Sequence, residues 1–121
     1  MAAFEVEAVA SGPHAVVVVR GEIDAHTSPL LKERLLALVA EGIDRLVVDL
    51  RAVTFIESVG LGTLVAARKR LRQSDKSLCL VLGPEQGVLR RTFEITGLDK
   101  VFPIHPDVEA AVEDCLREPA A

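Results

Sequence analysis

The chain has 121 residues, of which 50% are hydrophobic, and it carries 18 acidic against 14 basic side chains for a net charge of −4. A chain of this length and apolar content suits one compact domain that buries a core without disulfides or metal. Its acidic balance and its lack of Trp and Tyr provide neither a basic surface nor stacking platforms for nucleic acid. We therefore expect no nucleic-acid partner.

Compartment and cofactor use are indicated by patterns that the sequence lacks. The first residues contain no basic segment followed by an apolar one, and no apolar run approaches the roughly 20 residues that span a bilayer. We therefore expect a cytoplasmic protein without membrane insertion. Cys79 lies in an apolar run and Cys115 in a distant helical pattern, which predicts two reduced, structural cysteines. The three histidines are scattered among turn-like residues, so no metal site and no cofactor are predicted.

Hydrophobic periodicity and turn residues divide the chain into strands and helices. Residues 4–10 alternate apolar and polar side chains, 11–14 form a turn and 15–19 are continuously apolar, which predicts an antiparallel hairpin before a loop at 21–29. Further strands are predicted at 45–50, 78–82 and 101–104. Helices are predicted from Thr27 or Ser28 to Gly42, after Ser58, over 85–96 and from 106 to about 117. In the third helix, the residues available for the core are Val88, Leu89, Phe93 and Ile95.

The resulting order, ββαβαβαβα, predicts an α/β fold. Apolar strands separated by helices imply a mixed, mainly parallel sheet of about five strands with about four helices, joined by right-handed crossovers. The sequence contains no linker, internal repeat or low-complexity segment. We therefore expect one domain over residues 1–117, followed by a frayed tail at 118–121.

Residues 53–62 carry the most informative pattern in the chain. An apolar run there ends in Glu57, Ser58 and two glycines before helical periodicity begins, which indicates a strand-to-helix junction. The first turn of a helix leaves backbone N–H groups unpaired, and its dipole favours an anion near Ser58. Gly60 and Gly62 allow close packing of the helix against the sheet or close approach of a partner. The simpler interpretation, which we favour for Ser58, is that its side-chain oxygen caps the helix.

Three kinds of chemistry are disfavoured. A triad of Ser58 with His26 and Asp24 would need a nucleophile elbow, which requires a small residue where Ile56 stands. Asp49 as a receiver-type phosphoacceptor would need an acidic magnesium cluster that residues 17–20 lack, so pairing or capping is the favoured role of Asp49. No segment ends in the Gly-Lys-Ser/Thr of a nucleotide-binding loop. We therefore expect no enzyme activity.

Several ordered motifs resemble one known family. They are Gly21-Glu22-Ile23-Asp24 followed by Thr27 and Pro29, then Val48-Asp49-Leu50, Val53-Thr54-Phe55-Ile56-Glu57-Ser58 and Gly60-Leu61-Gly62, and finally Phe93, Gly97, Leu98 and Phe102. In this combination the chain is similar to the STAS-domain family, typified by bacterial anti-sigma factor antagonists. The resemblance covers nearly the whole chain.

The resemblance implies a binding switch in which the chain docks on a protein-kinase-like anti-sigma factor and frees a sigma factor. The residues that it places at the partner surface are Asp24, Thr27, Glu57, Ser58, Val59, Gly60, Leu61 and Gly62. Phosphorylation-regulated members read Asp-Ser-Ser-Gly and accept phosphate on the second serine, whereas the aligned residues here are 57–60. Val59 occupies the acceptor position without a hydroxyl, so the switch is expected to be absent or moved to Ser58.

A missing acceptor also suits a second reading. A STAS domain can serve as a constitutive scaffold in a signalling complex, or as a subunit of a lipid-transport ABC system. The two readings differ in the partner that they predict, which is an anti-sigma factor in the first and other subunits of an assembly in the second.

Overall fold

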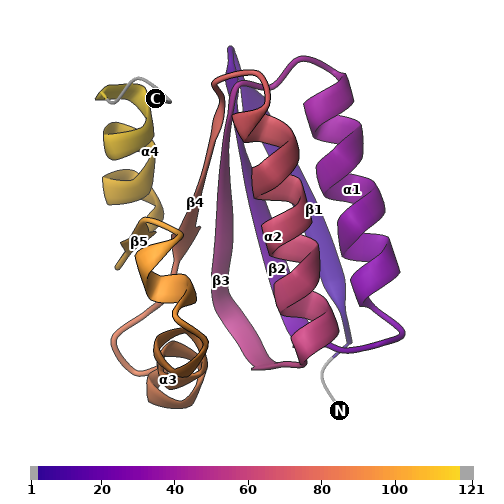
Figure 1. The fold of residues 1–121 in the computed structure, drawn as a ribbon, viewed down its shortest axis with the longest axis vertical. Coiled ribbons are helices and arrows are strands. Elements are labelled where there is room, and N and C mark those ends of the chain that lie inside the picture. The colour runs from indigo at the N-terminus through magenta and orange to yellow at the C-terminus, as the bar shows by residue number, and fades with distance from the viewer. Residues whose placement is uncertain (1–2, 118–121) are drawn as a thin grey trace.

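The elements of the chain follow the predicted order (Figure 1). A computed structural model describes residues 3–117, and side chains as far as Asp114. The elements are β1 (Glu5–Ser11), β2 (His14–Ile23), α1 (Ser28–Ala40), β3 (Arg45–Ile56), α2 (Ser58–Arg72), β4 (Ser77–Val81), α3 (Gly87–Thr96), the 3₁₀ turn η1 (Leu98–Lys100), β5 (Ile104–His105) and α4 (Val108–Arg117). The ββαβαβαβα prediction is confirmed. The predicted tail, 118–121, lies outside the described residues.

The five strands form one sheet in the order β1-β2-β3-β4-β5, with β1 antiparallel to β2 and every later pair parallel. Each parallel step is joined by one helix, α1, α2 or α3. Because crossovers of one hand that proceed in one direction across a sheet place their helices on the same side, these three helices share a face. The predicted mixed, mainly parallel sheet is confirmed.

Alternating side chains of the strands feed two separate cores, because successive residues of a strand point to opposite faces. Leu46, Val48 and Leu50 of β3 belong to the main core with the buried leucines of α1 and α2. Val47 belongs to a smaller cluster on the other face, where α4 supplies Ala111. The fourth helix thus covers β3, β4 and β5 from the side opposite α1 and α2.

Two strands run further than predicted. β2 continues to Ile23 and β3 to Ile56, although residues 21–23 were expected in a loop and the third strand was expected to end at residue 50. Gly21 has φ +94° and lies at an irregularity in the β2–β3 register, so the glycine that resembles a turn is a bulge inside a strand. A Cβ atom there would lie 2.9 Å from the Ala3 carbonyl oxygen.

The third predicted helix and the last predicted strand also differ in detail. α3 begins at Gly87, two residues later than expected, and the last strand is Ile104–His105 instead of 101–104. Leu89 and Phe93 are buried as predicted, but Val88 and Ile95 are 83% and 73% exposed. They lie seven residues apart, on the helix face turned away from the core.

Within the described residues, no helix combines the length and apolar character needed to cross a membrane.

The prediction that Cys79 is reduced is wrong. This residue is 3% exposed in the smaller cluster and is disulfide-bonded. The side chain of Cys115 lies outside the described residues. Separation along the sequence did not indicate that β4 packs against α4, which is what makes Cys79 a neighbour of that helix.

Candidate partner-binding site

The two predicted partner segments, 24–27 and 57–62, meet at the end of the sheet where β2 and β3 finish, the lower end in Figure 1. Ile23 and Ile56 are paired in register at these strand ends. Beyond them, the Glu57 N–H donates a hydrogen bond of 2.9 Å to the Ile23 carbonyl oxygen. Parallel strands therefore bring together two segments more than 30 residues apart in sequence.

The Asp24 loop is organised by its own side chains. The Asp24 carboxylate accepts hydrogen bonds from the backbone N–H groups of His26 (2.9 Å) and Thr27 (3.0 Å). The Thr27 hydroxyl accepts from the Asp24 N–H and donates to the Glu22 carbonyl oxygen, both at 2.8 Å. Thr27 stands at the N-cap of α1 as predicted, but its side chain makes no cap hydrogen bond because it closes the loop instead. Asp24 and Thr27 therefore shape the predicted partner surface through this loop.

The charge of Asp24 should make the loop sensitive to acid. The backbone hydrogen bond from Thr27 is the main cause that lowers the pKa of Asp24 below its ordinary value of 3.8, with His26 adding to it and partial desolvation opposing it. A lowered pKa in the folded state gives stability that is present above the unfolded pKa and is lost as the pH falls through the folded one. We expect wild type to be more stable than Asp24→Asn at neutral pH, with the difference shrinking below about pH 3.8. Chemical denaturation across pH measures it, and a difference independent of pH would contradict the assignment.

Ser58 is the first residue of α2, and Glu57 takes the cap position with extended backbone. The hydrogen bonds that begin the helix run from the N–H groups of Gly60 (2.9 Å) and Leu61 (3.2 Å) to the Glu57 carbonyl oxygen. The expectation that Ser58 caps the helix is therefore wrong. Its side chain is exposed at the positive end of the helix dipole, where an anionic group is favoured.

The two glycines of the junction differ in their surroundings. A Cβ atom on Gly60 would lie 2.5 Å from Ile23 Cγ2 and 2.9 Å from Ile56 Cγ1, whereas one on Gly62 would meet nothing within 4 Å. Close packing of the helix against the sheet thus accounts for Gly60 and not for Gly62. Leu61 is only 7% exposed and belongs to the main core. Gly60 and Leu61 support the predicted surface from beneath, while Glu57, Ser58, Val59 and Gly62 are exposed on it.

An open groove of about 520 Å³ lies between the N-terminal halves of α1 and α2. Its lining residues are Ser28, Pro29 and Lys32 from α1, with Val59, Gly62 and Thr63 from α2. Val59 is 46% exposed and adds an apolar wall, and Lys32 adds a positive charge. Sequence reasoning missed Lys32 and Thr63 as site residues. The predicted order of elements could have identified them, because helices that follow neighbouring parallel strands pack side by side.

Asp49 lies on the other face of β3. Its carboxylate accepts hydrogen bonds from Arg51 Nε and Nη2, each at 3.0 Å, and Asp49 is 4% exposed. The hydrogen bond to Asp49 is the main cause that raises the pKa of Arg51. The prediction that Asp49 pairs is confirmed, and the pairing leaves this carboxylate buried under a guanidinium.

Sequence comparison decides the family. The family description "STAS domain" matches residues 5–111. The chain belongs to the STAS-domain family. This STAS protein is 45% identical over 92 residues to the anti-sigma-B factor antagonist of Listeria monocytogenes, covering 75% of the chain and 78% of that relative. It is 38% identical over 93 residues to the anti-sigma-B factor antagonist of Staphylococcus aureus, covering 77% of the chain and 84% of that relative.

Solved structures support the same family. An anti-sigma factor antagonist from Mycobacterium paratuberculosis superposes on the STAS protein with a TM-score of 0.85 and 34% identity, covering 94% of this chain and 95% of that one. The Bacillus cell fate determinant SpoIIAA in its phosphorylated form gives a TM-score of 0.69 with 18% identity, covering 93% and 98%. The likeness to SpoIIAA shows the shared fold alone, whereas the likeness to the Mycobacterium protein extends to the sequence.

Proposed function

We propose that this STAS protein is an anti-sigma factor antagonist, which binds a serine-kinase-type anti-sigma factor and thereby releases a sigma factor for transcription. The observation that carries the proposal is the exposed first turn of α2, where Ser58 and Val59 stand beside the groove shared with α1. The names of the relatives, anti-sigma-B factor antagonists, support the same role.

The proposed action is binding alone. The Asp24 loop, the exposed residues of the β3–α2 junction and the groove between α1 and α2 form one surface at the ends of β2 and β3. When this surface occupies the anti-sigma factor, the sigma factor is freed by competition. No covalent step on this chain is needed, and we propose that the protein acts in the cytoplasm, where sigma factors work.

The experiment that tests the proposal is direct binding. The purified chain is titrated by calorimetry against each serine-kinase-type anti-sigma factor that the same organism encodes, and release of the sigma factor from a preformed complex is followed in parallel. We expect one such partner to bind and to give up its sigma factor. Absence of binding to every one of these kinases would overturn the proposal.

Phosphorylation at the usual position should fail. A phosphate would add about −1.5 to −2 charge to the middle of the surface, next to Glu57, and would oppose docking. Val59 has no hydroxyl, so incubation with the kinase and ATP should leave the wild type unmodified, while Val59→Ser should gain one phosphate. Intact-mass spectrometry measures both. A phosphate-sized mass increase on the wild type that disappears in Ser58→Ala would instead show that Ser58 is the acceptor.

The valine at the acceptor position also favours a second candidate function. A domain without a phosphorylation switch suits a constitutive scaffold, or a subunit of a lipid-transport ABC system. Affinity purification from the native organism separates the two proposals. Recovery of transport ATPase subunits in place of an anti-sigma factor would support the scaffold.

A further inference from the structure

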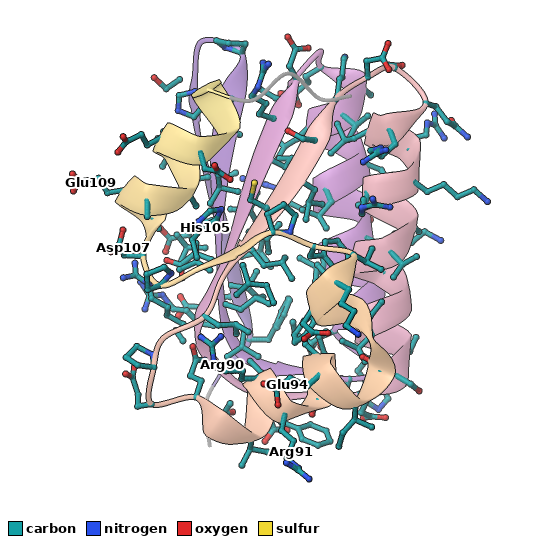
Figure 2. The ribbon with its side chains drawn as sticks, turned by 60° about the vertical axis from the view of Figure 1, so that its left-hand side comes forward. Arg90, Arg91, Glu94, His105, Asp107 and Glu109 are labelled. Carbon is teal, nitrogen blue, oxygen red and sulfur yellow. The ribbon has the colours of Figure 1, made fainter. Side chains whose placement is uncertain are left out.

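Three potential metal ligands meet on the face of the sheet that α4 covers, opposite the proposed docking surface. They come from three elements, Cys79 from β4, His105 from β5 and Asp114 from α4. Their ligand atoms all lie within 4.8 Å of one another. Figure 2 shows His105 among the side chains beside α4. Sequence analysis predicted no metal site because the three residues are far apart along the chain.

Cys79 is buried, and the other two ligands are partly shielded from solvent. Cys79 is 3% exposed, and the side chains of His105 and Asp114 are 18% and 33% exposed. Nε2 of His105 lies 3.1 Å from Oδ2 of Asp114, yet it is buried and makes no hydrogen bond within the described part of the chain. Next to a sulfur atom and a carboxylate, such a buried imidazole nitrogen can serve as a ligand to a cation, which would satisfy this otherwise unpaired polar atom.

We propose that the reduced form of this protein binds a zinc ion between β4, β5 and α4, through Cys79, His105 and Asp114. Thiolate, imidazole and carboxylate are all zinc ligands, and the thiolate selects against magnesium and calcium. The charges match, since one thiolate and one carboxylate balance a divalent cation. Tetrahedral bonds of about 2.0–2.3 Å require the three ligand atoms to draw together by roughly 1 Å, which rotation of the His105 and Asp114 side chains supplies.

The site is coupled to the redox state because Cys79 is disulfide-bonded. A dithiol reductant attacks the disulfide, leaves as a new disulfide and returns two thiols, one of them on Cys79. Zinc then displaces a proton from each thiol that it binds. A water molecule completes the fourth position of the zinc ion. The oxidised protein, whose sulfur is occupied, lacks the thiolate.

The test is a zinc titration of the full chain, reduced with a phosphine and stripped with a chelator, against a chromophoric zinc chelator. We expect one tight zinc per reduced chain and at least about 100-fold weaker binding to the oxidised chain. Cobalt as a probe should give a thiolate-to-metal absorption band that the oxidised protein lacks. His105→Ala and Asp114→Asn should each weaken binding by about 10-fold to 100-fold or more, whereas the control His26→Ala, an exposed histidine of the Asp24 loop, should not change it.

Two outcomes would overturn the proposal. One is equal zinc binding by the reduced and oxidised chains, and the other is binding by His105→Ala and Asp114→Asn that matches His26→Ala. Circular dichroism reports whether each variant is folded. If reduction itself unfolds the chain, zinc must restore the fold, and failure to do so counts as refutation. The experiment needs no anti-sigma factor, so its result is independent of the proposed function.

Discussion

Replacing Gly60 by Ala should lower the free energy of unfolding by about 1–2 kcal/mol. The new methyl group would lie 2.5 Å from Ile23 Cγ2 and 2.9 Å from Ile56 Cγ1, and overpacking of this kind costs about 1–3 kcal/mol. The higher helix propensity of alanine offsets up to about 1 kcal/mol of this cost. Denaturant unfolding of the wild type and the variant measures the difference. Because both contacted isoleucines support the β3–α2 junction, binding of the proposed anti-sigma factor partner should weaken as well.

Gly62→Ala is the matched control two residues away in the same helix. A Cβ atom there meets nothing within 4 Å, so only the propensity term remains and the variant should gain up to about 1 kcal/mol. The two alanine variants thus differ in sign. Equal effects on the unfolding free energy would show that contact with Ile23 and Ile56 does not determine the requirement for glycine at position 60.

Replacing Val59 by Asp should reduce affinity for the proposed anti-sigma factor partner by about 30-fold or more, the equivalent of about 2 kcal/mol. Val59 is 46% exposed and lines the groove between α1 and α2. A carboxylate there has to lose its hydration on docking. Calorimetric titration with the partner gives the loss directly, and the unfolding free energy should stay nearly unchanged because the side chain is on the surface.

Val9→Asp provides the control for the same change of charge. Val9 is 67% exposed on β1, an edge strand of the sheet, and it pairs with Val16 near the start of β2, away from the junction at the end of that strand. We expect this variant to bind the partner as the wild type does. A comparable loss of affinity in both variants would place the docking surface elsewhere or show that added negative charge weakens binding wherever it stands.

Most of the fold could be predicted from sequence, because apolar runs and helical periodicity report burial and chain direction. The errors have local causes. Gly21 resembles a turn residue but occupies a bulge, so the predicted second strand ends too early. Val88 and Ile95 are apolar like core residues, but their spacing of seven places both on the outer face of α3. Composition alone does not distinguish an apolar residue in the core from one on the surface.

The site was predictable in its segments and less so in its geometry. The Asp24 loop and the β3–α2 junction carry turn and glycine patterns that stand out in the sequence. Lys32 looks like any surface lysine, and only the packing of α1 beside α2 places it in the groove. The cluster of Cys79, His105 and Asp114 depends on three separate elements meeting, which no local pattern reports.

The hydrogen bond of 2.9 Å between Glu57 and Ile23 has a consequence for how a partner is recognised. With Gly60 packed on Ile23, the end of β2 and the start of α2 form one rigid unit before any partner arrives. A surface that is already ordered loses little conformational entropy on binding. Association should therefore resemble the docking of preformed shapes, with small backbone movement, and differences in affinity among partners should be expressed mainly in how long each complex lasts.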